Sequence, residues 1–339
     1  MINRCIIING GFGLEHLDLV ERDIPEPGHG EVLVRIEAVS LNRRDVLLAQ
    51  GVYNPKQKLP IVPCSDGAGI IAALGPGCTR HAVGDRVVIH MFPGWLAGEP
   101  DRDKLATGLG GPRGDGTLRQ YMVMREDSVV ALPRCISTEA AATLPCAALT
   151  AWSAIVESGQ TRAGDSVLIQ GTGGVSLFAL QFARMCGAHV VATTSSAEKA
   201  ERLKALGANA VVNYRTDRDW ASTARDLAGG RIDLIVDVGG AETLDAGLRV
   251  VRPGGTIALV GVLSGAKAEI NLPLALMRQV RLQGVTCGSR ESLEAMLRAI
   301  ALHGVYPVID SRFPLAEARS AFVRMAESAH VGKIVVLPH

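Results

Sequence analysis

Short apolar or alternating segments, separated by turn residues, fill the first part of the chain. Examples are residues 31–39 (EVLVRIEAV), 69–74 (GIIAAL) and 84–90 (GDRVVIH), each flanked by Gly, Pro or Asp. Segments of this length between turn signals predict strands. We therefore expect residues 1–130 to form a mostly β domain.

A different pattern begins near residue 140. Apolar runs such as SVLIQ, HVVAT and IDLIVDV alternate with Ala-rich helical stretches, which is typical of βαβ units in a parallel sheet. Residues 289–339 hold two helical stretches and a closing apolar run, KIVVL, which depart from this rhythm. The predicted fold class is α/β, with a doubly wound parallel-sheet domain (131–288) inserted into a discontinuous β domain (1–130, completed by 289–339).

Composition limits the partners. Lys and Arg number 35 against 34 Asp and Glu, a net charge of +1, which gives no field to attract nucleic acid or an anionic membrane. The seven cysteines are scattered and never spaced C-x-x-C, a pattern that argues against disulfides and a zinc knuckle. No apolar run has the length of a signal peptide core or a membrane span. We expect a soluble cytoplasmic protein with a small-molecule partner.

A strand, a glycine turn and a helix follow one another in the order that a dinucleotide site requires. The glycines let the backbone approach a pyrophosphate, which then lies on the free N–H groups of the helix N-terminus. A serine stands where the third glycine of such a turn is expected. The predicted binding turn consists of Gly171, Thr172, Gly173, Gly174, Val175 and Ser176.

The end of the next strand indicates which nucleotide binds. Thr194 and Ser195 lie there with Lys199 shortly after, and no Asp or Glu stands where an NAD enzyme grips both ribose hydroxyls. Hydroxyls and a lysine suit the 2′-phosphate of NADPH. The alternative is that Ser195 caps the following helix and Lys199 is a solvated helix residue; both interpretations stay open at this point.

Several motifs occur together in a fixed order: SLNRRD (40–45), VPCSDGAGII (62–71), GDRV (84–87), residues 139–152, GTGGVS (171–176), LGANAVVNY (206–214), DVGG (237–240) and PGGTIALVG (253–261). With these motifs the chain resembles the medium-chain dehydrogenase/reductase superfamily, and in particular its zinc-independent quinone oxidoreductase-like branch. The resemblance runs over essentially the whole chain. It implies a chaperonin-10-like β domain made from both chain ends, a Rossmann domain between them, and an active site in the cleft.

The resemblance also assigns further cofactor contacts. Lys199 and Tyr214 match residues that contact the 2′-phosphate, with Ser195 beside them. Thr150 matches a residue near the nicotinamide, and Lys333 a basic residue that reaches the pyrophosphate. The strand ends under the nicotinamide ring correspond to Gly239, Val260, Gly261 and Val262.

The zinc ligands of related alcohol dehydrogenases are mostly replaced here. By resemblance, Asn42 stands for the first cysteine, Ser65 for the histidine and Asp66 for the neighbouring glutamate, so that only Cys146 keeps a ligand identity. A catalytic zinc needs three protein ligands. The segment that matches the structural zinc loop, residues 91–116, contains neither Cys nor His. We predict no metal at either site, and Cys146 is more simply a small buried residue.

Without a Lewis acid to polarise an alkoxide, acceptors that are already activated by conjugation, quinones and enones, become the favoured substrates. Asn42 could hydrogen-bond a substrate carbonyl, and Tyr53 could donate a proton or line the pocket. Asp45, Ser65 and Asp66 complete the candidate catalytic set, although a structural role for the two acids is as good an interpretation.

Two other functions stay open: an alcohol or aldehyde dehydrogenase of the same superfamily, and a non-catalytic NADPH-binding protein with a structural or regulatory role. We also expect a homodimer, because the segment 280–287 (VRLQGVTC) resembles the edge strand that relatives pair across a two-fold axis.

Overall fold

The computed structural model describes residues 2–112 and 114–339, which divide into two compact units. Unit 1 comprises Met1–Leu149 and Ser289–His339, and unit 2 comprises Thr150–Gly288. The first boundary therefore lies later than residue 130. The reason is that helix α3 (Thr138–Ala142) packs against the strands of unit 1.

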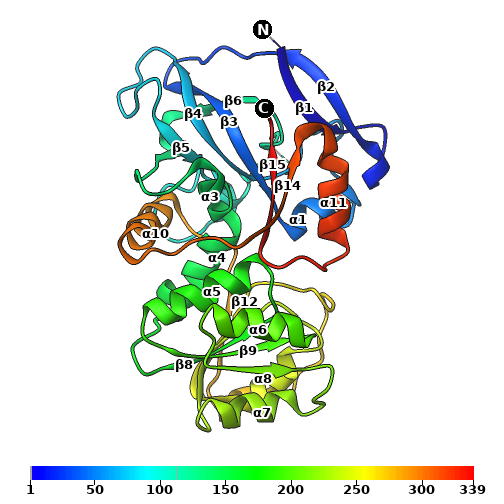
Figure 1. Cartoon of the computed structure of the whole chain (residues 1–339), viewed down its shortest axis with the longest axis vertical. Coiled ribbons are helices and arrows are strands. Elements are labelled where there is room, and N and C mark those ends of the chain that lie inside the picture. The colour runs from blue at the N-terminus through cyan, green and yellow to red at the C-terminus, as the bar shows by residue number, and fades with distance from the viewer. Residues whose placement is uncertain (1, 113) are drawn as a thin grey trace. The chain divides into compact units, whose positions relative to one another are not determined.

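Unit 1 is built on two sheets (Figure 1). Strands β1 (Ile2–Ile8) and β2 (Leu17–Asp23) form an antiparallel pair. The larger sheet has the order β14-β15-β3-β4-β5-β7, with β6 also paired to β3. Its strands are β3 (Glu31–Leu41), β4 (Asp66–Leu74), β5 (Arg86–Ile89), β6 (Tyr121–Arg125), β7 (Val129–Ala131), β14 (Ile309–Pro314) and β15 (Lys333–Leu337). The closing apolar run KIVVL thus joins the first half of the chain by pairing with β3.

The helices of unit 1 are short and cover parts of these sheets. They are α1 (Arg43–Ala49), α2 (Arg102–Leu105), α3, α10 (Arg290–His303) and α11 (Ala318–Ala326), with a π-helix at Leu144–Ala148. Helix α11 contacts α1, β14 and β15, and its buried Phe322 belongs to the same apolar core as Ile36 and Ile71 of the large sheet. The core therefore unites segments from both ends of the chain.

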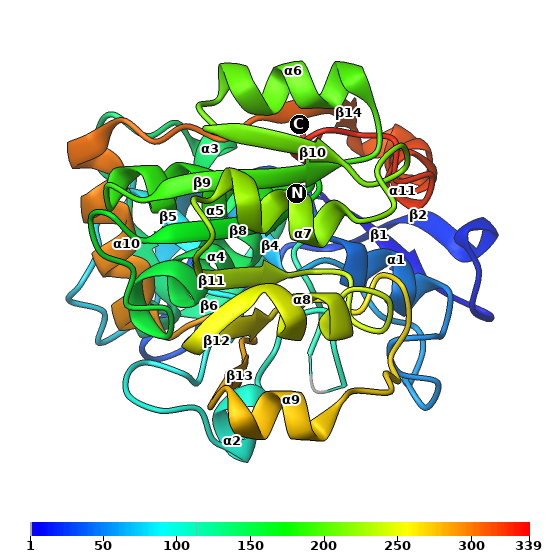
Figure 2. The same cartoon turned by 90° about the horizontal axis from the view of Figure 1, so that it is seen from below.

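Unit 2 is a parallel sheet with helices packed against it (Figure 2). The strand order is β10-β9-β8-β11-β12-β13, in which the sequence of connections reverses direction beside β8, as in dinucleotide-binding folds. Its strands are β8 (Ser166–Gln170), β9 (His189–Thr194), β10 (Ala210–Asn213), β11 (Ile232–Asp237), β12 (Val251–Leu259) and β13 (Arg281–Gly284). Every residue of β8 and β11 is buried, as expected for central strands of a covered sheet.

The α-helices of unit 2 are α5 (Gly174–Met185), α6 (Ala197–Ala205), α7 (Trp220–Leu227), α8 (Leu244–Val250) and α9 (Leu272–Met277). The boundary between the units falls after the first residue of α4 (Leu149–Trp152). Helix α5 directly follows the glycine turn and packs on β8 and β9. The predicted order of strand, turn and helix is therefore present. Among the described residues, no helix combines the length and apolarity that a membrane crossing requires.

Candidate active site and nucleotide site

Three strand ends meet in unit 1 and bring distant polar residues together. In the antiparallel pairing of β15 with β3, Ile334 lies opposite Leu41, so that Lys333 lies beside Asn42. In the pairing of β3 with β4, Ser40 lies opposite Asp66. The register of two strand pairs thus gathers residues from three distant parts of the chain at one edge of the sheet.

Asp66 is fully buried and holds several donors. Its Oδ1 accepts a hydrogen bond from the Ser65 hydroxyl (2.8 Å), and its Oδ2 accepts one from the backbone N–H of Cys146 (3.3 Å). The Lys333 ammonium lies 3.8 Å from the same Oδ2. Ser65 and Asp66 are 0% exposed, so that they support the site from within the protein.

Asn42 is the N-cap of α1 and is held on two sides. Its backbone N–H donates to Asp45 Oδ2 (2.8 Å), and its side-chain Oδ1 accepts from Lys333 Nζ (2.5 Å). Its side-chain nitrogen, Nδ2, is buried and has no hydrogen-bond partner among the described residues. An amide donor without a partner in a buried position is unusual in a folded protein.

Arg44 completes the charge balance of the site. Its guanidinium lies 3.6 Å from Asp45 Oδ1 and donates to the carbonyls of Leu109 and Gly110 (3.0 and 3.1 Å). It also lies 5.0 Å from the centroid of the Tyr53 ring, within the range of a cation–π contact. Tyr53 itself is 50% exposed. The sequence did not single out Arg44, which anchors α1 and Tyr53 to the loop that follows α2.

Burial shifts the pKa values of two groups in this site. It raises the pKa of Asp45 to about 6; the Arg44 charge opposes this rise, and Asp66 adds to it. Burial and the Asp66 charge raise the pKa of the Cys146 thiol to about 12. Cys146 is partly buried, and its raised pKa favours the neutral thiol as long as no metal ion is bound to it.

The donor set does not match a catalytic zinc site. Among the described residues, no group of three or more His, Cys, Asp or Glu side chains is arranged to hold a metal ion. The positions equated with the zinc ligands carry the amide of Asn42, the hydroxyl of Ser65 and the neutral thiol of Cys146. A cation, the Lys333 ammonium, already lies beside Asp66.

In unit 2 the glycine turn has the geometry that a pyrophosphate needs. Gly171 has φ +77°, and a Cβ added at Gly171 or Gly173 would meet no atom within 4 Å. The backbone is thus open on the side where a phosphate approaches the N-terminus of α5. Ser176, in place of the third glycine, is buried and donates its hydroxyl to the carbonyl of Gln170 (2.7 Å). The departure from the glycine pattern is therefore accommodated by a hydrogen bond within the fold.

The end of β9 carries the residues predicted to select the nucleotide. The N-cap of α6 is Ser196, whose hydroxyl accepts from the backbone N–H of Lys199 (3.2 Å). The expectation that Ser195 caps this helix is therefore wrong, because the helix begins one residue later. The Thr194 hydroxyl is buried without a hydrogen-bond partner among the described residues. Tyr214 follows β10, is 45% exposed, and its backbone N–H donates to the Thr194 carbonyl (3.0 Å).

Further predicted cofactor residues lie at the carboxyl ends of β11 and β12, where open α/β sheets bind ligands. Gly239 follows β11, and Val260, Gly261 and Val262 follow β12. The sequence missed Gln170 at the end of β8, whose side-chain carbonyl accepts from the N–H groups of Val238 and Gly239 (3.2 and 3.3 Å). Thr150 is buried at the start of unit 2.

Lys333 takes a place other than the one expected. The resemblance predicted that it reaches a pyrophosphate, but the side chain is 2% exposed and its ammonium donates to the Leu41 carbonyl (2.8 Å) and to Asn42. Because these acceptors and Asp66 surround the charge, Lys333 belongs to the polar cluster of unit 1.

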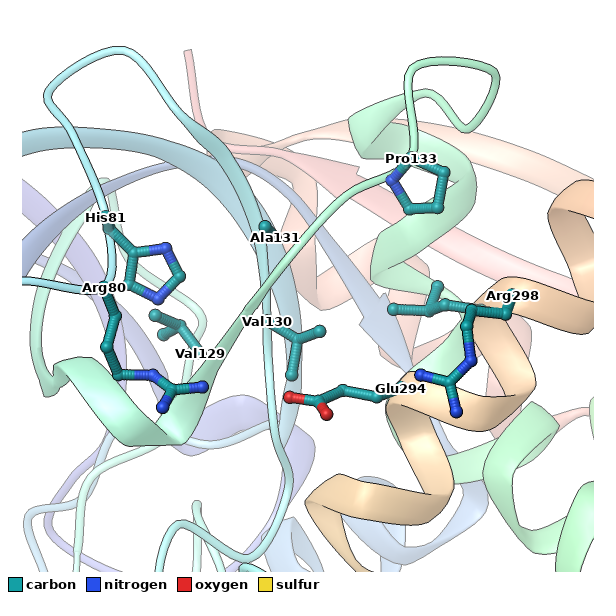
Figure 3. A pocket seen from close by; sticks show the side chains of 9 residues that line it. Arg80, His81, Val129, Val130, Ala131, Pro133, Glu294 and Arg298 are labelled. Carbon is teal, nitrogen blue, oxygen red and sulfur yellow. The ribbon is translucent and has the colours of Figure 1, made fainter.

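A separate cavity lies between α10 and β7 in unit 1 (Figure 3). It is lined by Arg80, His81, Val129, Val130, Ala131, Pro133, Glu294, Leu297 and Arg298. No predicted site residue is among them, and Glu294 forms an ion pair with Arg290 (3.2 Å). The cavity is therefore not part of the candidate active site.

Comparisons with known proteins match this architecture. Residues 28–134 match the model of the alcohol dehydrogenase GroES-like domain, and residues 174–301 match that of zinc-binding dehydrogenases. A zinc-type alcohol dehydrogenase-like protein of Schizosaccharomyces pombe is 37% identical, with 99% of each chain covered. The chain belongs to the medium-chain dehydrogenase/reductase superfamily and is an oxidoreductase of that family.

The solved structures similar to this chain carry different activity names. An NAD-dependent alcohol dehydrogenase is 35% identical with a TM-score of 0.90, over 99% of this chain and 100% of that one. A mycobacterial quinone oxidoreductase is 29% identical with a TM-score of 0.81, over 99% and 100%. A mycobacterial protein solved in complex with NADPH is 29% identical with a TM-score of 0.82, over 99% of this chain and 100% of that one. Two of these three names carry a nicotinamide cofactor, NAD in one and NADPH in the other, and the two activities named are those of an alcohol dehydrogenase and a quinone oxidoreductase.

Proposed function

We propose that this protein is an NADPH-dependent reductase of quinones, enones or related activated carbonyls that works without a catalytic zinc. The observation that carries the proposal is the Lys333 ammonium beside Asp66 and Asn42, at the place where the zinc relatives hold their metal. A divalent cation there would be repelled by the ammonium charge and would find an amide and a hydroxyl in place of a thiolate and an imidazole.

The proposed reaction divides its tasks between cofactor and protein. When bound, the cofactor supplies the hydride, and the acceptor also takes up one proton, so that a quinone becomes a hydroquinone and an enone a saturated ketone. The Asn42 amide N–H lies free to donate to the acceptor oxygen, which gains negative charge as hydride arrives. Tyr53, half exposed, is the candidate that passes a proton from solvent. Asp45 holds the backbone of Asn42, and Arg44 lies over the Tyr53 ring. Ser65 donates to Asp66, which lies beside the Lys333 ammonium that donates to the Asn42 amide oxygen.

Selection of NADPH rests on the end of β9. A carboxylate is absent there in the sequence, and Ser196 makes the helix cap, so that Ser195 is not required for that purpose. Lys199 and Tyr214 offer a charge and a hydroxyl to a 2′-phosphate. The glycine turn of residues 171–176 supplies the pyrophosphate site.

We also propose a cytoplasmic homodimer that acts on a small molecule, without a nucleic-acid or membrane partner. Strand β13 pairs only with β12 among the described residues, and its four residues are exposed. Leu272, Leu276 and Met277 of the neighbouring α9 are also exposed, and pairing of two copies would cover these apolar side chains. The seven cysteines are free, which suits a reducing compartment.

The test combines three measurements on the purified protein: zinc content, titration with NADPH and NADH, and NADPH oxidation with a panel of quinones, enones, aldehydes and alcohols. We expect zinc-free protein that prefers NADPH and reduces quinones or enones. One zinc per chain with alcohol oxidation would favour the alcohol dehydrogenase instead, as the names of the relatives suggest. Tight NADPH binding without turnover of any acceptor would favour a non-catalytic role.

A further inference from the structure

The orientation of the Asn42 amide is fixed by its neighbour. The oxygen and nitrogen of an amide are nearly indistinguishable by shape, so that hydrogen-bond partners decide which way the group points. Lys333 Nζ is a donor only, and it lies 2.5 Å from Asn42 Oδ1. With the ammonium on that side, the amide oxygen must face Lys333, and the NH2 group must face away from it.

The ammonium that sets this orientation is itself immobile. It is buried, donates to the Leu41 carbonyl at 2.8 Å, and lies 3.8 Å from Asp66 Oδ2. These contacts come from residues of β3 and β4, the next two strands beside β15 on one side in the order β15-β3-β4. The backbone of Asn42 is held independently, because its N–H donates to Asp45. The amide is therefore fixed at both its main chain and its oxygen.

The outward NH2 group is the unsatisfied part of this arrangement. Asn42 is 8% exposed, and its Nδ2 has no partner among the described residues. A buried donor without a partner destabilises the fold, because it has lost its hydrogen bonds to water. A ligand that brings an acceptor oxygen to this nitrogen would remove the cost. The ammonium on the amide oxygen also polarises the amide and makes its N–H groups stronger donors.

We propose that Lys333 is a positioning residue: it clamps the amide oxygen of Asn42 so that the amide NH2 is presented to the carbonyl oxygen of the acceptor. This inference deepens the proposed reductase function and rests on it. Lys333 acts here through Asn42 and touches neither the acceptor nor the cofactor. The Asn42 amide, polarised by the Lys333 ammonium, would donate a hydrogen bond to the carbonyl oxygen of the acceptor and so stabilise the negative charge that develops there.

Three variants separate the two residues. Asn42→Asp keeps an oxygen toward Lys333 but replaces the donor NH2, and loss of such a donor lowers kcat by about 10²–10³-fold. In Lys333→Met the amide is free to turn its NH2 toward the Asp66 carboxylate, which keeps its hydrogen bonds from Ser65 and Cys146 but has lost the neighbouring ammonium charge. A charge-assisted hydrogen bond of this kind is worth about 1.5–3 kcal/mol, so that kcat/KM should fall by about 10- to 150-fold. In an Asn42→Ala background, Lys333→Met should change kcat/KM by less than about threefold.

Stability must be kept apart from positioning. Removing Lys333 leaves a buried carboxylate without its counter-charge, which destabilises the fold. If Lys333→Met does not fold, the pair Lys333→Met/Asp66→Asn removes both charges, and its kcat/KM and Asn42 signal are compared with those of Asp66→Asn alone, in which Lys333 still holds the amide oxygen. The matched control is Asp233→Asn in unit 2, which removes the charge of a buried carboxylate that forms ion pairs with Arg231 and Arg252. Asp233 lies at the opposite end of β11 from the predicted cofactor residues. We expect this control to lower Tm and to leave kcat unchanged.

A second readout does not depend on turnover. In protein labelled with 15N-asparagine, the Asn42 NH2 signal is identified by its loss in Asn42→Asp, and cyclohexanone is added in the presence of NADP+. We expect one sharp Asn42 signal that shifts with the ketone in the wild type, and a doubled or broadened signal in Lys333→Met. An unchanged single signal in Lys333→Met, or equal effects of Lys333→Met in the wild-type and Asn42→Ala backgrounds, would overturn the proposal. Absence of quinone or enone turnover with the expected signals would instead contradict the reductase function alone.

Discussion

At Gly173 a single substitution should affect the stability of the fold and the binding of a dinucleotide in opposite directions. It has φ −74°, a conformation open to any residue, and a Cβ there would meet no atom within 4 Å. Replacing Gly by Ala at a compatible position stabilises a protein by about 0.4–1 kcal/mol, because the unfolded chain is restricted. The Gly173→Ala variant should therefore melt at the wild-type temperature or slightly above it.

Cofactor binding should respond in the opposite direction. The open space above Gly173 is where the pyrophosphate is expected to approach the N-terminus of α5. A methyl group forced into a close-packed contact costs about 1–3 kcal/mol. At about 1.4 kcal/mol per factor of ten, the Kd for NADPH should rise roughly 5- to 140-fold.

Two other glycines provide the controls for this variant. Gly114 also has open space at its Cβ position, and its φ is not positive, so that Gly114→Ala should change neither Tm nor Kd. Gly171 has φ +77°, which costs a non-glycine residue about 1–2 kcal/mol, and Gly171→Ala should lower Tm. Thermal unfolding of the free protein and calorimetric titration with NADPH measure the two effects. Wild-type affinity in Gly173→Ala would refute the placement of the pyrophosphate at this turn.

Three further predictions follow from charge and exposure. Lys199→Ala should raise the Kd for NADPH about 10- to 100-fold, through loss of a charge-assisted contact, and leave the Kd for NADH unchanged. Lys204→Ala on the same helix is the control and should change neither Kd. If Lys199→Ala raised both Kd values equally, a contact with the 2′-phosphate would be contradicted. Burial raises the pKa of Asp45 from 3.8 to about 6, so that the folded state takes up a proton at a higher pH than the unfolded state. As the pH falls from 7 to 5, the unfolding free energy of the wild type should therefore rise by about 1 kcal/mol relative to that of Asp45→Asn. Denaturant titrations at both pH values that show no such change would argue that the pKa of Asp45 is not raised. Leu276→Asp should convert the dimer into a monomer in sedimentation velocity, and a wild type that is monomeric would sink the dimer proposal.

The sheet of unit 2 follows from the sequence because its signals are local. Runs such as SVLIQ and IDLIVD are short and mostly apolar, and the structure buries every residue of both, Asp233 included. Parallel strands covered by helices require this pattern. The first domain boundary was less accurate, because whether the short helix α3 belongs to one unit or the other depends on tertiary packing alone.

The polar cluster of unit 1 shows where local signals end. Lys333 and Asn42 are 291 residues apart in the sequence, and they meet because Ile334 pairs with Leu41. A shift of the register by one residue would point the lysine to the other face of the sheet. No periodicity or motif near Lys333 specifies that register. For the same reason Arg44 was missed, since its carbonyl partners lie in a loop without repeating pattern.

The N-cap of α6 was also difficult to predict from the sequence, because several hydroxyl residues precede this helix. Thr194, Ser195 and Ser196 are consecutive, and each is a good N-cap. The choice falls on Ser196 because β9 continues through Thr194 and the first helical residue is Ala197. The difference of one residue removes the capping role as an alternative for Ser195 and leaves its predicted phosphate contact as it was.

Two departures from the family pattern, at Ser176 and at Asn42, have opposite consequences. Ser176 differs from glycine by one hydroxymethyl group, and its hydroxyl donates back to the strand end at Gln170, so that its polarity is satisfied inside the fold. Asn42 accepts from Lys333 through its oxygen but leaves its nitrogen without a partner among the described residues. A buried donor without a partner is unusual in a folded protein. Under the proposed function, the Asn42 nitrogen is the atom that the acceptor oxygen would satisfy, so that the change at Asn42 is the one expected to alter the chemistry of the site.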